Sequence, residues 1–166
     1  GKGYPDGEAL KWLLRTSNMP EPVRRHSEAV SRKALSMARA LERAGICLDL
    51  DLVRSASLLH DIGKGRPDHA RLGADILVRS GYPAAAEIVR QHHDLDRIPK
   101  RADETLVVYL ADKMVQGDRE VTLEERFAGS LGKCVGNPEA MKHFERRRSQ
   151  ARQAWRVWEQ SVAACV

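Results

Sequence analysis

The sequence predicts an all-α fold, and two of its features carry that prediction. Apolar residues recur in steps of three and four, which is the period of an amphipathic helix, and no run alternates with the period of a strand for long. Proline and glycine punctuate these segments where helices begin and end. The length of 166 residues, with 42% hydrophobic and 31% charged residues, fits one globular domain over residues 1–166. We therefore expect a single bundle of about seven helices.

Two helices are predicted in the first part of the chain. Asp6 can cap a short helix through Leu14. Pro20 and Pro22 introduce a long helix, and Gly45 supplies its stop signal. The residues on one face of this long helix are Val23, His26, Val30, Ala34, Met37, Leu41 and Ala44. Because His26 belongs to this apolar stripe, we expect its imidazole to face the core.

The next helix ends in an unusual way. It starts at Asp49 or Asp51 and ends at His60-Asp61. Residues 62–67 follow as a turn, since two glycines and a proline in six residues cannot sustain a helix. A carboxylate at the carboxyl end of a helix opposes the helix dipole, and a local conflict of this kind is typical of a functional position.

The remaining helices follow from the same signals. They are expected over 69–79, 83–92 and 103–116, after a Thr122–Glu125 capping box, and over the C-terminal segment 137–164. The spacing of the last helix directs six residues inward: Met141, Phe144, Ala151, Trp155, Trp158 and Val162. For Trp155 and Trp158 we predict a core position, with a homodimer interface as the alternative.

Several properties of the sequence indicate where in the cell the protein is expected and whether it is part of a longer chain. No apolar run approaches the roughly 20 residues of a membrane-spanning helix, and no signal-peptide pattern opens the chain, so we expect no membrane partner. Cys47, Cys134 and Cys165 form neither a zinc motif nor a disulfide framework, which predicts a cytoplasmic location. The chain begins at Gly1 without a methionine, as a tag remnant or a domain of a longer chain would.

The net charge of +5 favours anionic partners. Three of the basic residues, Arg146, Arg147 and Arg148, are consecutive within the last helix, and we interpret them as a solvated face. Aromatic residues are only 5% of the chain and do not interleave with the basic ones. The sequence therefore argues against a nucleic-acid surface.

Histidines and aspartates stand at positions that five helices can bring together. They are His26, His60, Asp61, His69, His92, His93 and Asp112. Asp112 has the apolar neighbours Leu106, Leu110 and Met114, and a carboxylate close to buried surface needs a metal or another cation as its partner. Imidazoles and carboxylates together suit Fe, Mn, Co, Ni or Zn. The alternative, hydrogen-bonded core histidines and helix-end aspartates, requires several coincidences.

The order His26, His60-Asp61, Asp112 resembles the ligand signature of the HD-domain metal-dependent phosphohydrolase superfamily. The stretch HDIGK, from His60 to Lys64, is one of the common local forms of that family. The resemblance covers about residues 20–130. It implies a helical bundle with the metal site between helices, and one ion held by His26, His60, Asp61 and Asp112.

The same resemblance extends to a second ion. His69, His92 and His93 match the additional histidines of the binuclear branch, in which the HD aspartate bridges both ions. The alternative is that His69 or His93 lies outside the ligand set or binds the substrate phosphate. The family implies one or two divalent transition-metal ions as cofactors.

The chemistry implied is hydrolysis of a phosphate ester or anhydride, with a nucleotide or a small phosphorylated metabolite as substrate. Asp61 and Lys64 are the predicted catalytic residues, and Lys64, Arg66 and Arg119 are the predicted substrate contacts. Arg90 and Lys113 are weaker candidates. A departure from one branch of the family narrows the range of substrates. Here Gly81-Tyr82-Pro83 precedes His92-His93, whereas the Gly-Tyr-Pro of cyclic-dinucleotide phosphodiesterases follows the histidine pair, which argues against that branch.

Three further interpretations stay open. The stretch 109–127 is similar to HD domains found downstream of nucleotidyltransferase domains of the molybdenum-cofactor type, which implies a fusion with an N-terminal domain. The ligand list also suits an HD-fold di-iron oxygenase, or a non-catalytic module that senses a nucleotide or contacts a partner. Redox-active iron and oxygen consumption would distinguish the oxygenase from a hydrolase.

Overall fold

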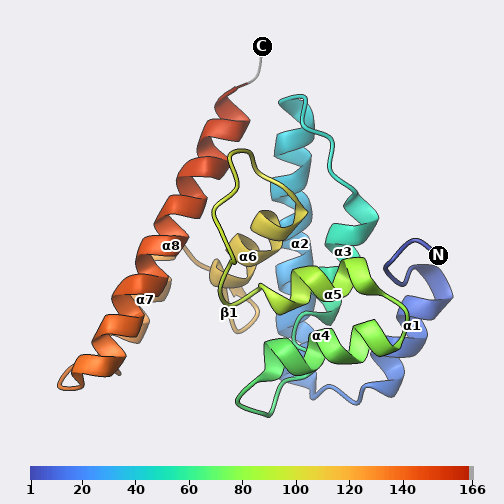
Figure 1. The fold of residues 1–166 in the computed structure, drawn as a ribbon, viewed down its shortest axis with the longest axis horizontal. Helices are drawn as coiled ribbons and strands as arrows, with labels where there is room; N and C mark the ends of the chain where they lie inside the picture. Colours follow the sequence, from blue (N-terminus) through green and yellow to red (C-terminus); the bar gives the residue numbers. More distant parts are fainter. Residues whose placement is uncertain (165–166) are drawn as a thin grey trace.

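A computed structural model describes residues 1–164 and confirms the all-α prediction (Figure 1). These residues form eight helices, one more than the expected seven or so. The helices are α1 Gly7–Thr16, α2 Glu21–Arg43, α3 Leu50–Leu59, α4 His69–Arg79, α5 Pro83–Arg90, α6 Glu104–Lys113, α7 Leu123–Leu131 and α8 Pro138–Ala163.

Most helix boundaries follow the predicted signals. The side chain of Asp49 accepts a hydrogen bond from Leu52 N at 3.1 Å and caps α3. The capping box of Thr122 and Glu125 is present at the start of α7. Pro22 lies in the first turn of α2, where its missing N–H costs no hydrogen bond. Local chemistry is therefore sufficient to set the starts of these helices.

The expected helix over 103–116 is too long, because the chain turns into a short hairpin. α6 ends at Lys113, and β1 Val115–Gln116 pairs antiparallel with β2 Arg119–Glu120. Gly117 has a φ of +63°, a left-handed conformation that favours glycine, and it begins the two-residue loop of this hairpin. α5 is likewise shorter than expected and ends at Arg90, which leaves His92 and His93 beyond the helix.

Two apolar clusters form the core, and α3 contributes to both. α2 runs through the centre of the bundle and packs against α3 and α6, with α8 along one side and α4 and α5 on the other (Figure 1). The first cluster includes Val30 and Leu41 of α2 and Val53 of α3. The second includes Leu59 of α3 and Leu77 of α4. Each such buried side chain stabilises the fold by about 1.5–3 kcal/mol. The end of α3 is therefore fixed between the two clusters.

α8 packs through one face, as predicted in part. Phe144 and Ala151 are buried, while Trp155 and Trp158 are partly buried against the first cluster and stack on each other with ring centroids 5.0 Å apart. Met141 and Val162 are also only partly buried. The two tryptophans thus contribute to the core from its edge.

The structure bears on the predictions about membrane-spanning helices and about the cysteines. No helix within residues 1–164 is long and apolar enough to span a membrane. Cys47 and Cys134 are free thiols, and Cys165 lies outside the described residues.

The turn after α3 makes a close backbone contact with α4. A Cβ atom on Gly63 would lie 2.5 Å from the carbonyl oxygen of His69 and 2.7 Å from the nitrogen of Gly73. No side chain fits there without moving backbone. The absence of a side chain at Gly63 therefore allows the start of α4 to approach the end of α3.

We predict that Gly63→Ala destabilises the protein by about 1–3 kcal/mol, because the new methyl group must displace the backbone of α4. The measurement is the urea midpoint of unfolding. Gly132→Ala is the matched control, since Gly132 has a helical φ of −59° and its Cβ would meet nothing within 4 Å. Equal midpoints for the two variants would contradict the close contact.

Candidate metal centre

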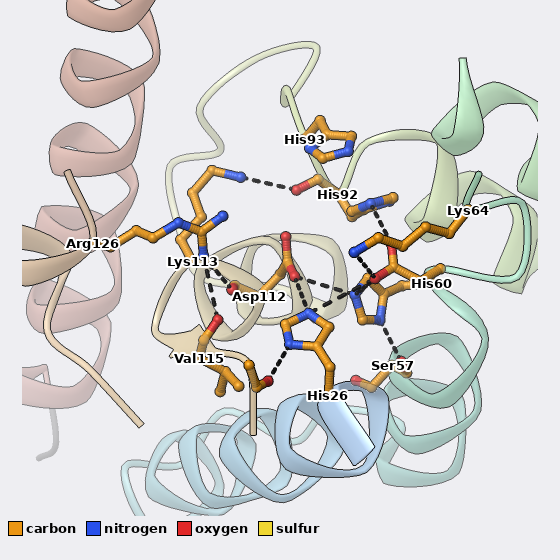
Figure 2. A network of polar contacts seen from close by, with 12 residues as sticks. His26, Ser57, His60, Lys64, His92, His93, Asp112, Lys113, Val115 and Arg126 are labelled. Atoms are coloured by element: carbon orange, nitrogen blue, oxygen red, sulfur yellow. Dashed lines mark hydrogen bonds and ion pairs between the residues drawn. The ribbon is translucent and has the colours of Figure 1, made fainter. Parts of the chain in front are cut away.

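The seven predicted His and Asp residues lie together, on five helices and the segments next to them. Figure 2 shows His26, His60, His92, His93 and Asp112 among them. His26 comes from α2, His60 and Asp61 from the end of α3, His69 from the start of α4, His92 and His93 from the segment after α5, and Asp112 from α6. A cavity of about 410 Å³ opens over them. His60 and His92 are fully buried beneath it, while His26, Asp61, His69, His93 and Asp112 line it.

One set of side chains surrounds the Oδ2 atom of Asp61. The Nε2 atom of His60 lies 3.3 Å from Asp61 Oδ2 and 3.2 Å from Asp112 Oδ1. The Nε2 atom of His26 lies 3.0 Å from the same Asp112 oxygen and 3.8 Å from Asp61 Oδ2. Two imidazole nitrogens and two carboxylate oxygens therefore face one point.

A second set surrounds the other oxygen of Asp61. The Nε2 atoms of His69 and His92 lie 3.5 Å and 3.6 Å from Asp61 Oδ1. The Nε2 atom of His93 is 2.6 Å from that of His69. Asp61 thus presents each of its two oxygens to a different group of imidazoles.

Backbone carbonyls fix the orientation of three of the rings. Each accepts a hydrogen bond of 2.7 Å from an Nδ1 atom: Gly117 from His26, Ser57 from His60 and Val89 from His92. The carbonyls of Ser57 and Val89 lie three residues before their histidines, at helix ends where a carbonyl oxygen keeps a lone pair free for a side-chain donor. This arrangement leaves the Nε2 lone pairs pointing into the cluster.

Two ring nitrogens without a hydrogen-bond partner indicate whether a cation fits the site. The Nε2 atoms of His60 and His92 are buried and have no hydrogen-bond partner among the described residues. They face carboxylate oxygens, which are acceptors, so each of these contacts needs a proton or a metal ion between the two atoms. Buried groups of this kind are satisfied by a metal ion or an added proton. The donor set of neutral nitrogen and charged oxygen suits a divalent transition metal.

The carboxylates of the cluster are held in their charged form. Burial favours the neutral form of Asp61 and Asp112, but contacts with imidazoles outweigh it and lower the pKa of both below the usual value. Burial likewise disfavours the charged form of His60, yet its contacts with Asp112 and Asp61 raise its pKa to about 10. A proton on His60 is then the species that a metal ion displaces.

The imidazoles of His69 and His93 in the second set are neutral at pH 7. Burial lowers the pKa of His69, and burial together with the neighbouring His92 and Lys113 lowers the pKa of His93 to about 3. Neutral imidazole is the form that coordinates a metal. The carboxylates and the imidazoles of His69 and His93 are therefore in the protonation state that a metal needs, while His60 must first lose its proton.

A positively charged rim surrounds the mouth of the cavity. Lys64 is half-exposed, with its Nζ atom 3.8 Å from Asp61 Oδ2. Arg126 and Lys133 line the opposite wall, and Arg126 also donates hydrogen bonds to the carbonyl oxygens of Asp112 at 3.2 Å and Val115 at 3.3 Å. The rim favours an anionic ligand next to the cluster.

Arg126 and Lys133 were not predicted from the sequence. Together with Ser130 they have the spacing i, i+4, i+7 and begin one turn after the capping box, so helical spacing would have grouped them. Only the tertiary structure, in which Arg126 donates to the carbonyl oxygen of Asp112, shows that this group faces the cluster. The role of the Gly117 carbonyl in orienting His26 was also beyond the sequence.

Four predicted phosphate contacts lie away from the cavity. Arg66 and Arg119 are exposed and are not among the residues that line it, so their role as substrate contacts stays a prediction. Arg90 pairs with Asp96 at 2.6 Å. Lys113 is buried behind the cluster and donates to the carbonyl oxygen of His92 at 3.1 Å, and burial lowers its pKa to about 8.

Residues 23–116 match the family model for the HD domain. The match covers more than half of the 166 residues, so the chain belongs to this family. HD domains bind divalent metals and membership suggests a metal-dependent hydrolase, in agreement with the cluster of possible ligands.

Several proteins resemble the chain over most of its length. An uncharacterized protein of Methanocaldococcus jannaschii is 30% identical over 135 residues, 68% of this chain and 79% of that protein. The tRNA (cytidine(56)-2′-O)-methyltransferase of Picrophilus torridus is 29% identical over 75% of this chain and 40% of its own length. Ribonuclease Y of Aquifex aeolicus is 35% identical over 69% of this chain and 21% of its own. The chain thus spans less than half of the last two proteins. No solved structure matches it significantly.

We predict that saturating Mn²⁺ or Fe²⁺ raises the melting temperature of the protein by about 5–10 °C, because a metal bound at a hundredfold excess over its Kd adds about 2.7 kcal/mol to stability. Asp61→Asn should remove most of this shift, since both ligand sets lose a charged oxygen. The matched control is Asp75→Asn, on the outer part of α4, which should keep it. Equal shifts in the two variants would exclude the cluster as the metal site.

Proposed function

We propose that the protein is a metal-dependent phosphohydrolase of the HDIGK type that acts on a nucleotide or a small phosphorylated metabolite. One observation carries the proposal: the two oxygens of a buried carboxylate, Asp61, face separate groups of imidazoles below a cavity with a positively charged rim. The first proposed ion has the ligands His26, His60, Asp61 and Asp112, and the second has Asp61, His69, His92 and His93.

The chemistry of such a site supports hydrolysis. When bound, divalent metals lower the pKa of a coordinated water from about 16 toward 7 and neutralise charge on phosphoryl oxygens. Asp61 orients the reacting groups, because its position is fixed by four surrounding imidazoles. Lys64 and Arg126 supply positive charge at the cavity mouth, where the non-bridging oxygens of the substrate would lie. One water is added across a P–O bond, and the leaving group takes its proton.

Only the surroundings of the site indicate which class of substrate it binds. The rim supports an anionic substrate, and the cavity of about 410 Å³ suits a small phosphorylated molecule. The names of two relatives refer to RNA, but the chain spans 40% and 21% of those proteins. We therefore include oligoribonucleotides beside mononucleotides as substrates to be tested. We also propose, from the residues 109–127, that the chain is the C-terminal part of a fusion with a nucleotidyltransferase domain.

The test is hydrolysis of a panel of nucleotides, phosphate esters and short oligoribonucleotides, with Mn²⁺, Fe²⁺ or Co²⁺ added. Release of inorganic phosphate reports on monoesters and terminal phosphates, and chromatography of the nucleotide products reports on the oligoribonucleotides. We expect turnover of at least one class of substrate, and its loss in Asp61→Ala, because that change removes a ligand from both proposed ions. Metal-loaded protein that releases nothing from any substrate would contradict the proposal. Oxygen consumption by the iron-loaded protein would then indicate the oxygenase alternative.

We predict that Lys64→Ala lowers kcat about 10- to 100-fold, because a cation near the reacting phosphate stabilises charge in the transition state but is half-exposed to water. The measurement is steady-state kinetics on the best substrate of the panel. Lys11→Ala, an exposed lysine of α1 that lines no cavity near the cluster, is the matched control. An unchanged kcat in Lys64→Ala would mean that this lysine is an exposed residue of the turn with no role in the reaction.

A further inference from the structure

A second cavity opens directly from the metal cavity. It has a volume of about 270 Å³ and shares four residues with the first: His93, Arg126, Ser130 and Lys133. It is bounded on the far side by α8. The second cavity, between α6, α7 and α8, is therefore the neighbour of the metal cavity, separated from it by these shared side chains.

The second cavity is strongly and consistently positive. Four cationic side chains line it, Lys113, Arg126, Lys133 and Arg147, and none of the described residues in its walls is acidic. This concentration of one sign of charge in a concave site attracts anions.

The two outer cations also lack partners of their own. Within residues 1–164, the side chains of Lys133 and Arg147 have no hydrogen bond and no ion pair. On the same helix as Arg147, by comparison, Arg152 contacts Glu124 at 3.1 Å. An unpaired lysine and an unpaired arginine on one concave wall are therefore available to an anionic ligand.

The remaining wall of the second cavity is apolar. The rings of Phe127 and Phe144 meet edge to face with centroids 5.8 Å apart, and Phe144 is buried. Ser130 adds a hydroxyl group on the side shared with the metal cavity. Aromatic edges beside a hydroxyl and several cations match a ribonucleoside with a phosphate attached, because the ring packs on apolar surface while the phosphate meets the cations.

We propose that the second cavity binds a second phosphate of the substrate together with the nucleoside next to it. The preferred substrates are then nucleotides with a phosphate beyond the one at the metal cluster, and single-phosphate esters are poor substrates. This inference rests on the proposed hydrolase function. The shared chemistry is a nucleoside between two phosphates, present both in small nucleotides and in single-stranded RNA.

The kinetic test compares adenosine 3′,5′-bisphosphate with 5′-AMP in the presence of Mn²⁺. We expect kcat/KM to be at least about 10-fold higher for the bisphosphate, because a charge-assisted phosphate contact is worth about one order of magnitude or more. Arg147→Gln and Lys133→Gln should each reduce this ratio several-fold. The matched control is Arg156→Gln, on α8 but outside both cavities, which should leave the ratio unchanged.

A binding test separates this inference from the hydrolase function. Calorimetry in EDTA, where no turnover occurs, should show the bisphosphate binding about 10-fold tighter than 5′-AMP, with the difference lost in Arg147→Gln. If the protein hydrolyses both compounds equally and binds them equally, the second cavity is no phosphate site and the hydrolase stands. If nothing is hydrolysed but the Arg147-dependent preference persists, the cavity assignment stands and hydrolysis falls.

The source of the second phosphate is tested with substrate length. A ten-residue oligoadenylate cleaved faster than the dinucleotide pApA would indicate single-stranded RNA. Equal or slower cleavage of the oligonucleotide would indicate a small nucleotide. Equal rates for all compounds, including 5′-AMP, would overturn the proposed subsite.

Discussion

The structure depends on a buried carboxylate that the fold must keep charged. Asp61 is 4% exposed and lies with Asp112 among imidazoles rather than water. Two ionised carboxylates in such a place are costly unless cations compensate them. The lone pairs of His60 and His92 face the same carboxylates, so the protein itself supplies few hydrogen-bond donors at the centre of the cluster. A polar inclusion of this kind between two apolar clusters is stable when an ion or protons occupy it.

The surrounding architecture serves to hold the cluster in place. α3 ends where the two apolar clusters meet, and its last carbonyl groups accept hydrogen bonds from the ligand that follows. The segment after α5 repeats this device with His92 and Val89. Gly63 lets the backbone of α4 approach closely enough for His69 to reach the second oxygen of Asp61. Helix ends and the segment directly after α5 therefore position the possible ligands.

The parts of the fold that follow from local chemistry were predictable, and those that depend on packing were not. The caps at Asp49 and Thr122 marked helix starts, and the order of histidines and aspartates indicated convergence before any contact was known. The hairpin at 115–120 was missed because its strands are only two residues each and show no alternation. Its Gly117 carbonyl orients His26, a contact between residues 91 positions apart. Arg126 was missed because its place beside the cluster also depends on packing between distant parts of the chain. The spacing of residues within one helix does not show which other helix it faces.

The possible metal ligands and most of the residues that line the second cavity lie in different parts of the sequence. All seven possible metal ligands lie between His26 and Asp112, within the residues 23–116 that match the family. The unpaired cations Lys133 and Arg147 and the apolar wall of Phe127 and Phe144 lie after that match, on α7, α8 and the connection between them. A shared cluster of possible metal ligands can thus be combined with different downstream helices, and in the proposed subsite those helices would contact the substrate beyond its reacting phosphate. Differences in substrate among members of this family are therefore expected to arise in α7 and α8, while changes in the cluster itself would alter whether any reaction occurs.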